Sequence, residues 1–416
     1  MNYPDSIRFL YALGNELKTA KFDLARIAIL LEALGSPHRQ GRFVHVAGTN
    51  GKGSTCAMIE SALRASGQRT GLYTSPHLSE PTERIRVEGV PVSPDEFAAA
   101  FDRVHGTAES LLADDRLDLH PTYFETVTAM AFLIFAEKRV DRTVLEVGLG
   151  GKLDATNVVH PEICVITPID FDHEAFLGKS LQSIAAEKAG ILKPGAPAVF
   201  AEQREQAAAV LEAKAAELGV AVTHSRQWPV TEVVGTREGS RFLSDGLLIE
   251  CPLAGAHQVE NARTAISALR ILGVPAAAIR KGIASVEWPG RIERISNDPE
   301  IILDGAHNPA GARALAAYID KFYAGQSIRL IYGAMRDKAV EEVAGILFPR
   351  FGEVIVTAPQ QPRALAPEVY PSLVDHPNLR IAANLGEAVH MIENSREPVF
   401  ITGSLFLVAE ARSMLI

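Results

Sequence analysis

Cysteine is scarce in this chain of 416 residues, which has only Cys56, Cys164 and Cys251. Three scattered cysteines build neither a disulfide framework nor a zinc site, and they fit a reducing compartment. Long apolar runs are also missing, since residues 127–136 fall short of the about 20 residues that a membrane-spanning helix needs. The charged opening stretch MNYPDSIRFL lacks the apolar centre of a secretory signal. We therefore expect a soluble cytoplasmic protein with no membrane partner.

An excess of positive charge is absent as well. The formal net charge is −9, with 47% hydrophobic and 22% charged residues. This balance is typical of a globular protein and argues against a nucleic-acid partner. The length exceeds the roughly 250–300 residues at which single cores stop growing, so two domains are expected.

Apolar strand candidates alternate with helical stretches along the chain. Such alternation predicts a mainly parallel sheet with helices on both faces. Residues 222–250 break the rhythm with short β-rich runs at 230–234, 241–243 and 247–250, which predict a β-hairpin appendage. The Trp-Pro-Gly sequence at residues 288–290 is the best linker candidate. We predict two α/β domains, residues 1–293 and 294–416. The strand candidates are residues 43–46, 70–73, 143–147, 163–167 and 198–200, and then 300–303, 328–332, 353–357 and 399–402.

A glycine-rich segment, AGTNGKGS at residues 47–54, follows the first strand and opens a helix. Backbone N–H groups and the helix dipole make such a turn a phosphate site, and Lys52 adds positive charge. Ser54 has the hydroxyl that would bind Mg²⁺. The strict Walker pattern fails, because Gly53 separates Lys52 from Ser54 and Val46 replaces the first glycine. The nucleotide-binding residues predicted here are Asn50, Gly51, Lys52, Gly53 and Ser54.

Four further residues have chemically informative positions. Glu146 ends an apolar strand, where a carboxylate is a natural Mg²⁺ ligand or simply a solvated side chain. Lys188 shares the apolar face of a helix over residues 180–189, so it is either a buried amine that tends to lose its proton or a lysine whose head reaches water. Asp304 and His307 lie on a strand-to-helix turn capped by Asn308, which is either a ligand-binding turn or a structural one.

Several segments together resemble the folylpolyglutamate synthase and dihydrofolate synthase family of the Mur ligase superfamily. The resemblance covers nearly the whole chain and implies an N-terminal P-loop ATPase-like domain and a smaller C-terminal Rossmann-like domain. It also implies a monomer. The matching segments are GTNGKGS (48–54), YTSPHL (73–78), TYFET (122–126), LEVGLGGKLDATN (145–157), EKAGI (187–191), DGAHNP (304–309) and TGS (402–404).

The resemblance implies roles for individual residues. Asn261 would contact the adenine end of ATP and Arg291 its phosphates, while Asp304 and His307 would be nucleotide-binding or catalytic, as would Lys52. Two Mg²⁺ ions are implied, and Lys188 would be carbamylated to complete the second site. The implied metal ligands are Ser54, Ser75, Glu146, His173 and Lys188. The implied substrate-binding residues are Phe124, Glu125, Thr126, Leu153, Asp154 and Ala155, with residues 21–23 as a weaker candidate.

The reaction implied is ATP-dependent addition of L-glutamate to dihydropteroate or a reduced folate through an acyl phosphate. Domain closure would keep water from that intermediate. A peptidoglycan-type Mur ligase is disfavoured, because too little chain precedes the phosphate loop for its extra domain. A nucleotide switch would leave Lys188 and His173 without a task. Departures from the family pattern are Lys152 for arginine, Ala339 for aspartate in the DKD motif, and Ala175-Phe176.

Overall fold

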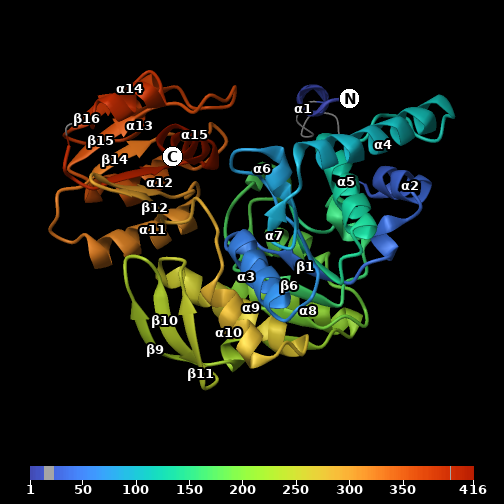
Figure 1. The fold of residues 1–416 in the computed structure, drawn as a ribbon. Helices are drawn as coiled ribbons and strands as arrows, with labels where there is room; N and C mark the ends of the chain where they lie inside the picture. Colours follow the sequence, from blue (N-terminus) through green and yellow to red (C-terminus); the bar gives the residue numbers. More distant parts are fainter. Residues whose placement is uncertain (14–22, 394) are drawn as a thin grey trace. The chain divides into compact units, whose positions relative to one another are not determined.

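The computed structural model describes residues 1–13, 23–393 and 395–416, which form two compact units. Unit 1 comprises Met1–Ile169, Leu181–Trp228 and Asn261–Ile283. Unit 2 comprises Asp170–Ser180, Pro229–Glu260 and Ala284–Ile416 (Figure 1). The domain division at residue 293 stays a prediction. Residues 21 and 22 of the weaker pterin candidate lie outside the described residues.

Unit 1 is built on a sheet whose described strands run in the order β4-β3-β2-β5-β1-β6-β7-β8. Neighbours from β2 to β8 pair in parallel, whereas β3 and β4 add an antiparallel edge. The predicted parallel α/β architecture is therefore confirmed for this unit. The strands are β1 (Phe43–Ala47), β2 (Thr70–Tyr73), β3 (Ile85–Val87), β4 (Val90–Pro91), β5 (Arg142–Glu146), β6 (Ile163–Ile166), β7 (Ala198–Phe200) and β8 (Val222–His224).

Helices cover this sheet because alternate side chains of its central strands point to opposite faces. Phe43 of β1 and Leu145 of β5 join a core with aromatic side chains of α4 and α5. Val44 and Val144, which pair at the alternate positions of the same two strands, point to the opposite face. Helix α3 contacts β1, β2 and β5. The helices are α1 (Tyr3–Ala12), α2 (Ala25–Ala33), α3 (Lys52–Ala65), α4 (Pro94–Ala113), α5 (Tyr123–Glu137), α7 (Leu181–Ala189), α8 (Glu205–Leu218), α9 (Ala256–Ile271), which begins in unit 2, and α10 (Ala276–Ala284).

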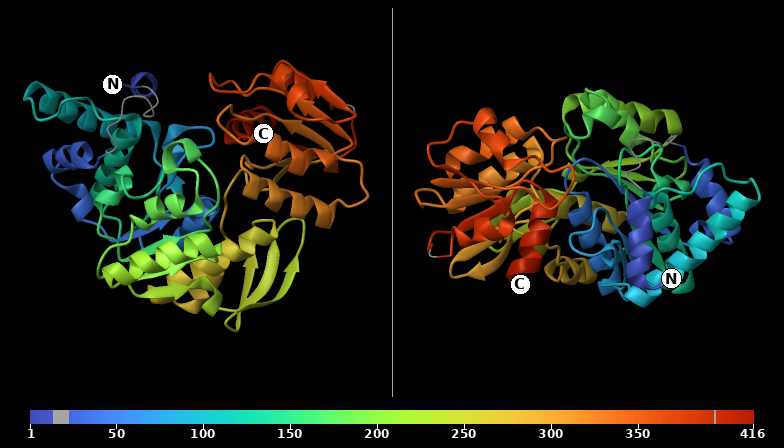
Figure 2. Two further views of the ribbon diagram at one scale, coloured as in Figure 1. Left: turned by 180° about the vertical axis from the view of Figure 1, so that it is seen from behind. Right: turned by 90° about the horizontal axis from the view of Figure 1, so that it is seen from above.

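Unit 2 contains two separate sheets, the yellow strands and the orange-to-red strands of Figure 2. The smaller one is antiparallel, in the order β11-β10-β9, and it has one strand for each of the three β-rich runs predicted for this segment. The larger sheet runs β12-β13-β17-β14-β15-β16 and is parallel except for β12. Its strands are β12 (Glu293–Asn297), β13 (Glu300–Leu303), β14 (Arg329–Tyr332), β15 (Glu353–Val356), β16 (Leu379–Ile381) and β17 (Val399–Thr402), and the smaller sheet has β9 (Val230–Gly235), β10 (Ser240–Ser244) and β11 (Leu247–Cys251).

The helices of unit 2 pack an apolar core against the larger sheet. Leu315 and Ile319 of α11, Val343 and Leu347 of α12 and Phe400 of β17 belong to one buried apolar cluster. The predicted cap is present, since the Asn308 side chain accepts the Gly311 N–H at the start of α11. The helices are α6 (Glu174–Leu177), α11 (Pro309–Phe322), α12 (Val340–Leu347), α13 (Tyr370–Leu373), α14 (Leu385–His390) and α15 (Leu405–Leu415).

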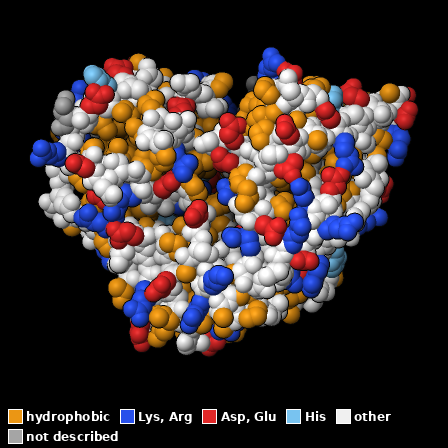
Figure 3. All heavy atoms as spheres, in the orientation of Figure 1, with side chains coloured by type: hydrophobic (Ala, Val, Ile, Leu, Met, Phe, Trp, Pro, Cys, Tyr) orange, Lys and Arg blue, Asp and Glu red, His pale blue; other side chains and the backbone are white. Residues whose placement is uncertain are grey.

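The surface carries charges of both signs. On the face drawn in Figure 3, lysine and arginine side chains are interspersed with aspartate and glutamate. Among the described residues, no helix combines the length and the apolar character needed to cross a membrane.

Candidate active site

The glycine-rich loop lies between β1 and α3, as predicted. Gly51 is the N-cap of α3 with φ +82°, and a Cβ there would meet Asn261 Oδ1 at 2.2 Å. At Gly48 a Cβ would lie 1.8 Å from Thr167 Oγ1. Glycine is therefore required at both positions by backbone conformation or by close approach. The contact at Gly51 places Asn261, which is predicted to bind nucleotide, against this loop.

Backbone hydrogen bonds fix which part of the loop offers its N–H groups to a ligand. The N–H groups of Thr49 and Asn50 donate to Pro168 O at 3.0 and 3.2 Å. Lys52 Nζ folds back and donates to Thr49 O at 3.1 Å. The predicted phosphate site therefore centres on the first turn of α3, at residues 51–54, where N–H groups and the helix dipole act together.

Lys188 is buried beside this loop. Its side chain on α7 is 5% exposed and shares a buried face with Leu181, Ile184 and Ala185, as the sequence predicted. Its Nζ donates to Gly48 O at 2.8 Å. The lysine head is thus inside the protein at the phosphate loop, and the alternative in which it reaches water is wrong.

Glu146 and Ser75 meet at the carboxyl edge of the sheet of unit 1. The Ser75 N–H donates to Glu146 Oε2 at 3.1 Å, and Glu146 is 5% exposed. Its charge also contributes, after burial, to raising the pKa of the Cys56 thiol on α3. Ser54, on the first turn of the same helix, is buried. Hydroxyl and carboxylate oxygens of this kind suit Mg²⁺, so the donor set fits the predicted ion.

Asp154 organises the loop that follows β5. One carboxylate oxygen accepts N–H groups of Gly148 and Leu149, both at 2.9 Å, and the other accepts the N–H and hydroxyl of Thr156 at 3.0 and 2.6 Å. Burial raises the pKa of Asp154, and these hydrogen bonds oppose the rise. Of its two neighbours in the predicted substrate segment, Ala155 is buried and Leu153 is 40% exposed. Asp154 therefore shapes this loop.

Sequence reasoning did not single out His45, which lies beneath that loop. Its Nε2 is 2.8 Å from Thr156 Oγ1. Burial lowers the pKa of His45 to about 3, so the ring is neutral.

The predicted substrate segment at the start of α5 has partners within unit 1. Glu125 forms a capping box with Thr122, and its Oε2 lies 3.1 Å from Arg26 Nε. Thr126 is buried. Phe124 packs near Tyr73 and would lie 2.6 Å from a Cβ at Gly148. Sequence reasoning missed Arg26, which lies 99 residues away. Glu125 thus has two structural tasks in addition to its predicted role.

The turn after β13 gathers the predicted residues of unit 2. Asp304 accepts the N–H groups of Ala306 and Ile292 at 2.9 and 3.0 Å. Burial raises the pKa of Asp304, against the opposing charge of Arg291. Arg291 lies along this turn, because a Cβ on Gly305 would meet its Nη1 at 2.2 Å. The structure therefore brings Arg291 and Asp304 together.

Asp172 of unit 2 joins two further polar groups to this turn. Its carboxylate accepts from Lys338 Nζ at 2.6 Å and from Asn308 Nδ2 at 3.1 Å, and it lies 3.5 Å from His307 Nε2. Burial alone would raise the pKa of Asp172, but the hydrogen bond and charge of His307 and the charge of Lys338 outweigh burial and hold it well below its usual range. Sequence reasoning missed both Asp172 and Lys338, although Lys338 lies in the altered DKD motif.

His173 follows Asp172 and is the N-cap of α6, with φ +52°. Its Nε2 lies 3.8 Å from Asp172 Oδ1. It belongs to unit 2, whereas Lys188 and Glu146 belong to unit 1. Its pairing with Lys188 around the second metal ion stays a prediction.

Comparisons with known proteins agree with this arrangement. Two families match the chain, the Mur ligase middle domain over residues 95–269 and the Mur ligase glutamate ligase domain over residues 290–405. Folylpolyglutamate synthase of Lacticaseibacillus casei is 36% identical, over 100% of this chain and 99% of that protein. Dihydrofolate synthase/folylpolyglutamate synthase of Bacillus subtilis is 35% identical, over 94% of each chain.

A solved structure shares the fold along the whole chain. It is Mycobacterium tuberculosis folylpolyglutamate synthase complexed with ADP and AMPPCP, with a TM-score of 0.91, 33% identity, and coverage of 100% of this chain and 99% of that one. Together with the phosphate loop, these likenesses define an ATP-dependent ligase of the Mur type. More narrowly, the chain belongs to the folylpolyglutamate synthase and dihydrofolate synthase family. The family, fold class and enzyme class expected from the sequence are confirmed.

Proposed function

We propose that the chain joins L-glutamate to dihydropteroate and to reduced folates, in the cytoplasm and as a monomer. The observation that carries most weight is the buried Lys188 amine on the Gly48 carbonyl, because a switch that only binds nucleotide has no use for a buried lysine at its phosphate loop. Relatives whose names include both synthase activities support both acceptors.

In the proposed reaction, the acceptor carboxylate attacks the γ-phosphorus of ATP. ADP leaves and an acyl phosphate forms. The amino group of glutamate then adds to the acyl carbon and loses a proton, and the tetrahedral intermediate expels inorganic phosphate to leave the amide. Lys52 and the first turn of α3 stabilise the negative charge of the transferring phosphoryl group. Arg291 binds the ATP phosphates, and Asn261 contacts the adenine end. Asp304 and His307 have nucleotide-binding or catalytic roles.

Magnesium would be held by Ser54, Ser75 and Glu146 at one site and by His173 and Lys188 at a second. Bound there, Mg²⁺ supplies positive charge to the phosphate oxygens. Lys188 requires a carbamate for this role, formed when its neutral amine adds CO₂ and releases a proton. The contact with Gly48 is compatible with that modification, because a carbamate nitrogen retains one N–H to donate to the carbonyl.

The folate substrate is proposed to contact two segments of unit 1. Phe124, Glu125 and Thr126 belong to the start of α5. Leu153, Asp154 and Ala155 belong to the loop after β5. Asp154 and Glu125 act here chiefly by positioning, since their carboxylates are already engaged with the protein.

The direct test is ATP- and Mg²⁺-dependent phosphate release with glutamate, comparing dihydropteroate with tetrahydrofolate. Turnover with both acceptors is expected, and product mass should increase by one glutamyl unit. Lys52→Met should abolish turnover, whereas Lys214→Ala, which removes a partly exposed lysine on α8, should match the wild type. Phosphate release with neither acceptor, in protein that binds ATP, would overturn the proposal.

A further inference from the structure

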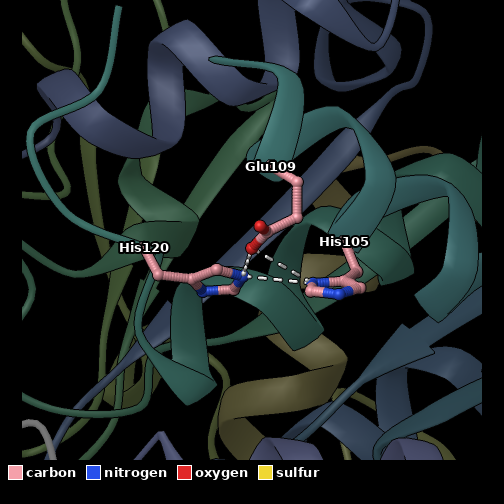
Figure 4. Close-up of side chains that lie close together, drawn as sticks. All are labelled: His105, Glu109 and His120. Atoms are coloured by element: carbon pink, nitrogen blue, oxygen red, sulfur yellow. Dashed lines mark hydrogen bonds and ion pairs between the residues drawn. The ribbon is translucent and has the colours of Figure 1, made fainter. Parts of the chain in front are cut away.

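One side-chain cluster in unit 1 has no part in the proposed reaction. His105 and Glu109 stand one turn apart on α4, and His120 lies in the segment that leads into α5. Figure 4 shows the two rings and the carboxylate pointing toward one another. Two imidazoles and one carboxylate are the donor set of many transition-metal sites.

The spacing of the three donor atoms matches the size of a metal ion. His105 Nδ1 lies 3.3 Å from His120 Nε2, and each of these nitrogens lies 3.8 Å from Glu109 Oε1. The circle through the corners of a triangle with sides of 3.3, 3.8 and 3.8 Å has a radius of about 2.1 Å. An ion at the centre of this circle is therefore at the usual distance of zinc from histidine nitrogen and carboxylate oxygen.

The other nitrogen of His120 is held in the way that metal-binding histidines usually are. His120 Nδ1 lies 2.8 Å from Pro121 O. Because a carbonyl oxygen only accepts hydrogen bonds, Nδ1 carries a hydrogen, which leaves Nε2 as the ring nitrogen whose lone pair can bind a metal. That lone pair faces His105 and Glu109 (Figure 4). A backbone carbonyl that fixes the histidine tautomer is a common second partner in metal sites.

Aromatic side chains fix the rings, while the mouth of the cluster stays open. Phe101 stacks on His105 with centroids 5.4 Å apart, and Phe9 lies 4.4 Å from His105 and 5.5 Å from His120. The two histidine side chains are 16% exposed, and that of Glu109 is 56% exposed. An ion therefore has access from solvent and room for water as a further ligand.

We propose that His105, Glu109 and His120 bind one divalent transition-metal ion of the zinc class. Imidazole nitrogens suit Zn²⁺, Co²⁺ and Ni²⁺, whereas Mg²⁺ prefers oxygen ligands. The site is separate from the magnesium sites proposed for catalysis. Its ion links α4 to the segment that enters α5, whose first turn carries Phe124 and Glu125. Metal binding should therefore stabilise unit 1 and fix the start of α5.

The test is a Zn²⁺ titration of the full chain by calorimetry, with Mg²⁺ in large excess and with a non-hydrolysable ATP analogue bound. The wild-type chain should bind one equivalent of Zn²⁺. The His120→Gln and Glu109→Gln variants should bind this Zn²⁺ ion far more weakly. Loss of an outer-shell partner costs about 10- to 100-fold in metal affinity, and loss of a ligand should cost at least as much. Co²⁺ should give a visible absorption band in wild type and lose it in both variants.

A matched control is the exposed pair formed by His390 and Glu393, in which Nδ1 of the histidine lies 2.9 Å from Oε2 of the glutamate. His390→Gln should keep the wild-type Zn²⁺ affinity, because that pair is not part of any three-residue donor group among the described residues. Should His120→Gln fail to fold, Glu109→Gln decides alone, since its side chain is largely exposed. Equal Zn²⁺ affinity in wild type, Glu109→Gln and His390→Gln would overturn the proposal, and would leave the two rings as a hydrogen-bonded pair in an aromatic cluster.

Discussion

Replacing Lys188 separates its structural task from its proposed chemical one. Lys188→Ala removes three buried methylenes, at about 0.8 kcal/mol each, and leaves the Gly48 carbonyl without this donor, at about 1–3 kcal/mol. Lys188→Met keeps most of the buried volume and loses only the amine. The free energy of unfolding should therefore fall by roughly 3–5 kcal/mol in the alanine variant, and by less in the methionine variant.

Catalysis should follow a different order from stability. Both variants lose the carbamate, so kcat for glutamate addition should fall about 10²- to 10³-fold in each, the usual effect of removing one electrostatic stabiliser. Formate or acetate should partly restore the alanine variant, which has a cavity for a small carboxylate. It should not restore the methionine variant, whose side chain fills that space. Wild-type activity should fall in CO₂-depleted buffer and recover with bicarbonate.

Phosphate release and chemical denaturation of the same preparations provide the measurements. Lys214→Ala serves as control for the loss of a lysine on the surface of unit 1. A Lys188→Met variant that forms the amide at the wild-type rate would refute the metal-site part of the mechanism. Equal rescue of both variants by formate would refute the carbamate.

Three further outcomes follow from contacts in unit 1. Gly48→Ala should weaken ATP binding and cost about 1–3 kcal/mol of stability, because its Cβ would lie 1.8 Å from Thr167 Oγ1. Calorimetry measures the ATP affinity and thermal melts measure the stability. Wild-type affinity and stability in this variant would contradict the geometry. Glu125→Ala should cost about 0.5–1.5 kcal/mol for the hydrogen bond that its side chain accepts from the Thr122 N–H at the start of α5. Loss of the partner of the buried Arg26 should add to that cost, and unchanged stability would argue against the capping role. His45 has a pKa of about 3 in the folded protein and of about 6.5 in the unfolded chain. Between these pH values only the unfolded chain takes up the proton. The contribution of His45 to the free energy of unfolding is therefore complete above pH 6.5 and is lost as pH falls toward 3, by about 1.4 kcal/mol per pH unit. His45→Gln should flatten that part of the curve of unfolding free energy against pH, and an unchanged slope would refute this explanation.

Features set by neighbouring residues were predictable from the sequence. The loop between β1 and α3 follows from its glycines and lysine, and the buried face of α7 from the spacing of Leu181, Ile184 and Lys188. The cap at Asn308 follows from an amide side chain before proline. Each depends on contacts within a few turns, where helical period and capping chemistry act directly.

Features that join distant segments were not predictable in this way. The pairing of Asp172 with Lys338 spans 166 residues, and nothing in either local sequence specifies the other. The sequence predicts Asp154 as a substrate-binding residue, but its four hydrogen bonds to its own loop depend on the folded conformation of that loop, which the local sequence does not specify.

The short edges of the large sheet in unit 1 affect how the protein behaves at high concentration. One edge is β4, only Val90 and Pro91, and proline has no N–H to offer an incoming strand. The other is β8, three residues long. Unpaired edges invite strands of neighbouring molecules, and brevity and proline both discourage such pairing. The strands of four and five residues lie inside the sheet, so this unit presents little template for aggregation through its edges.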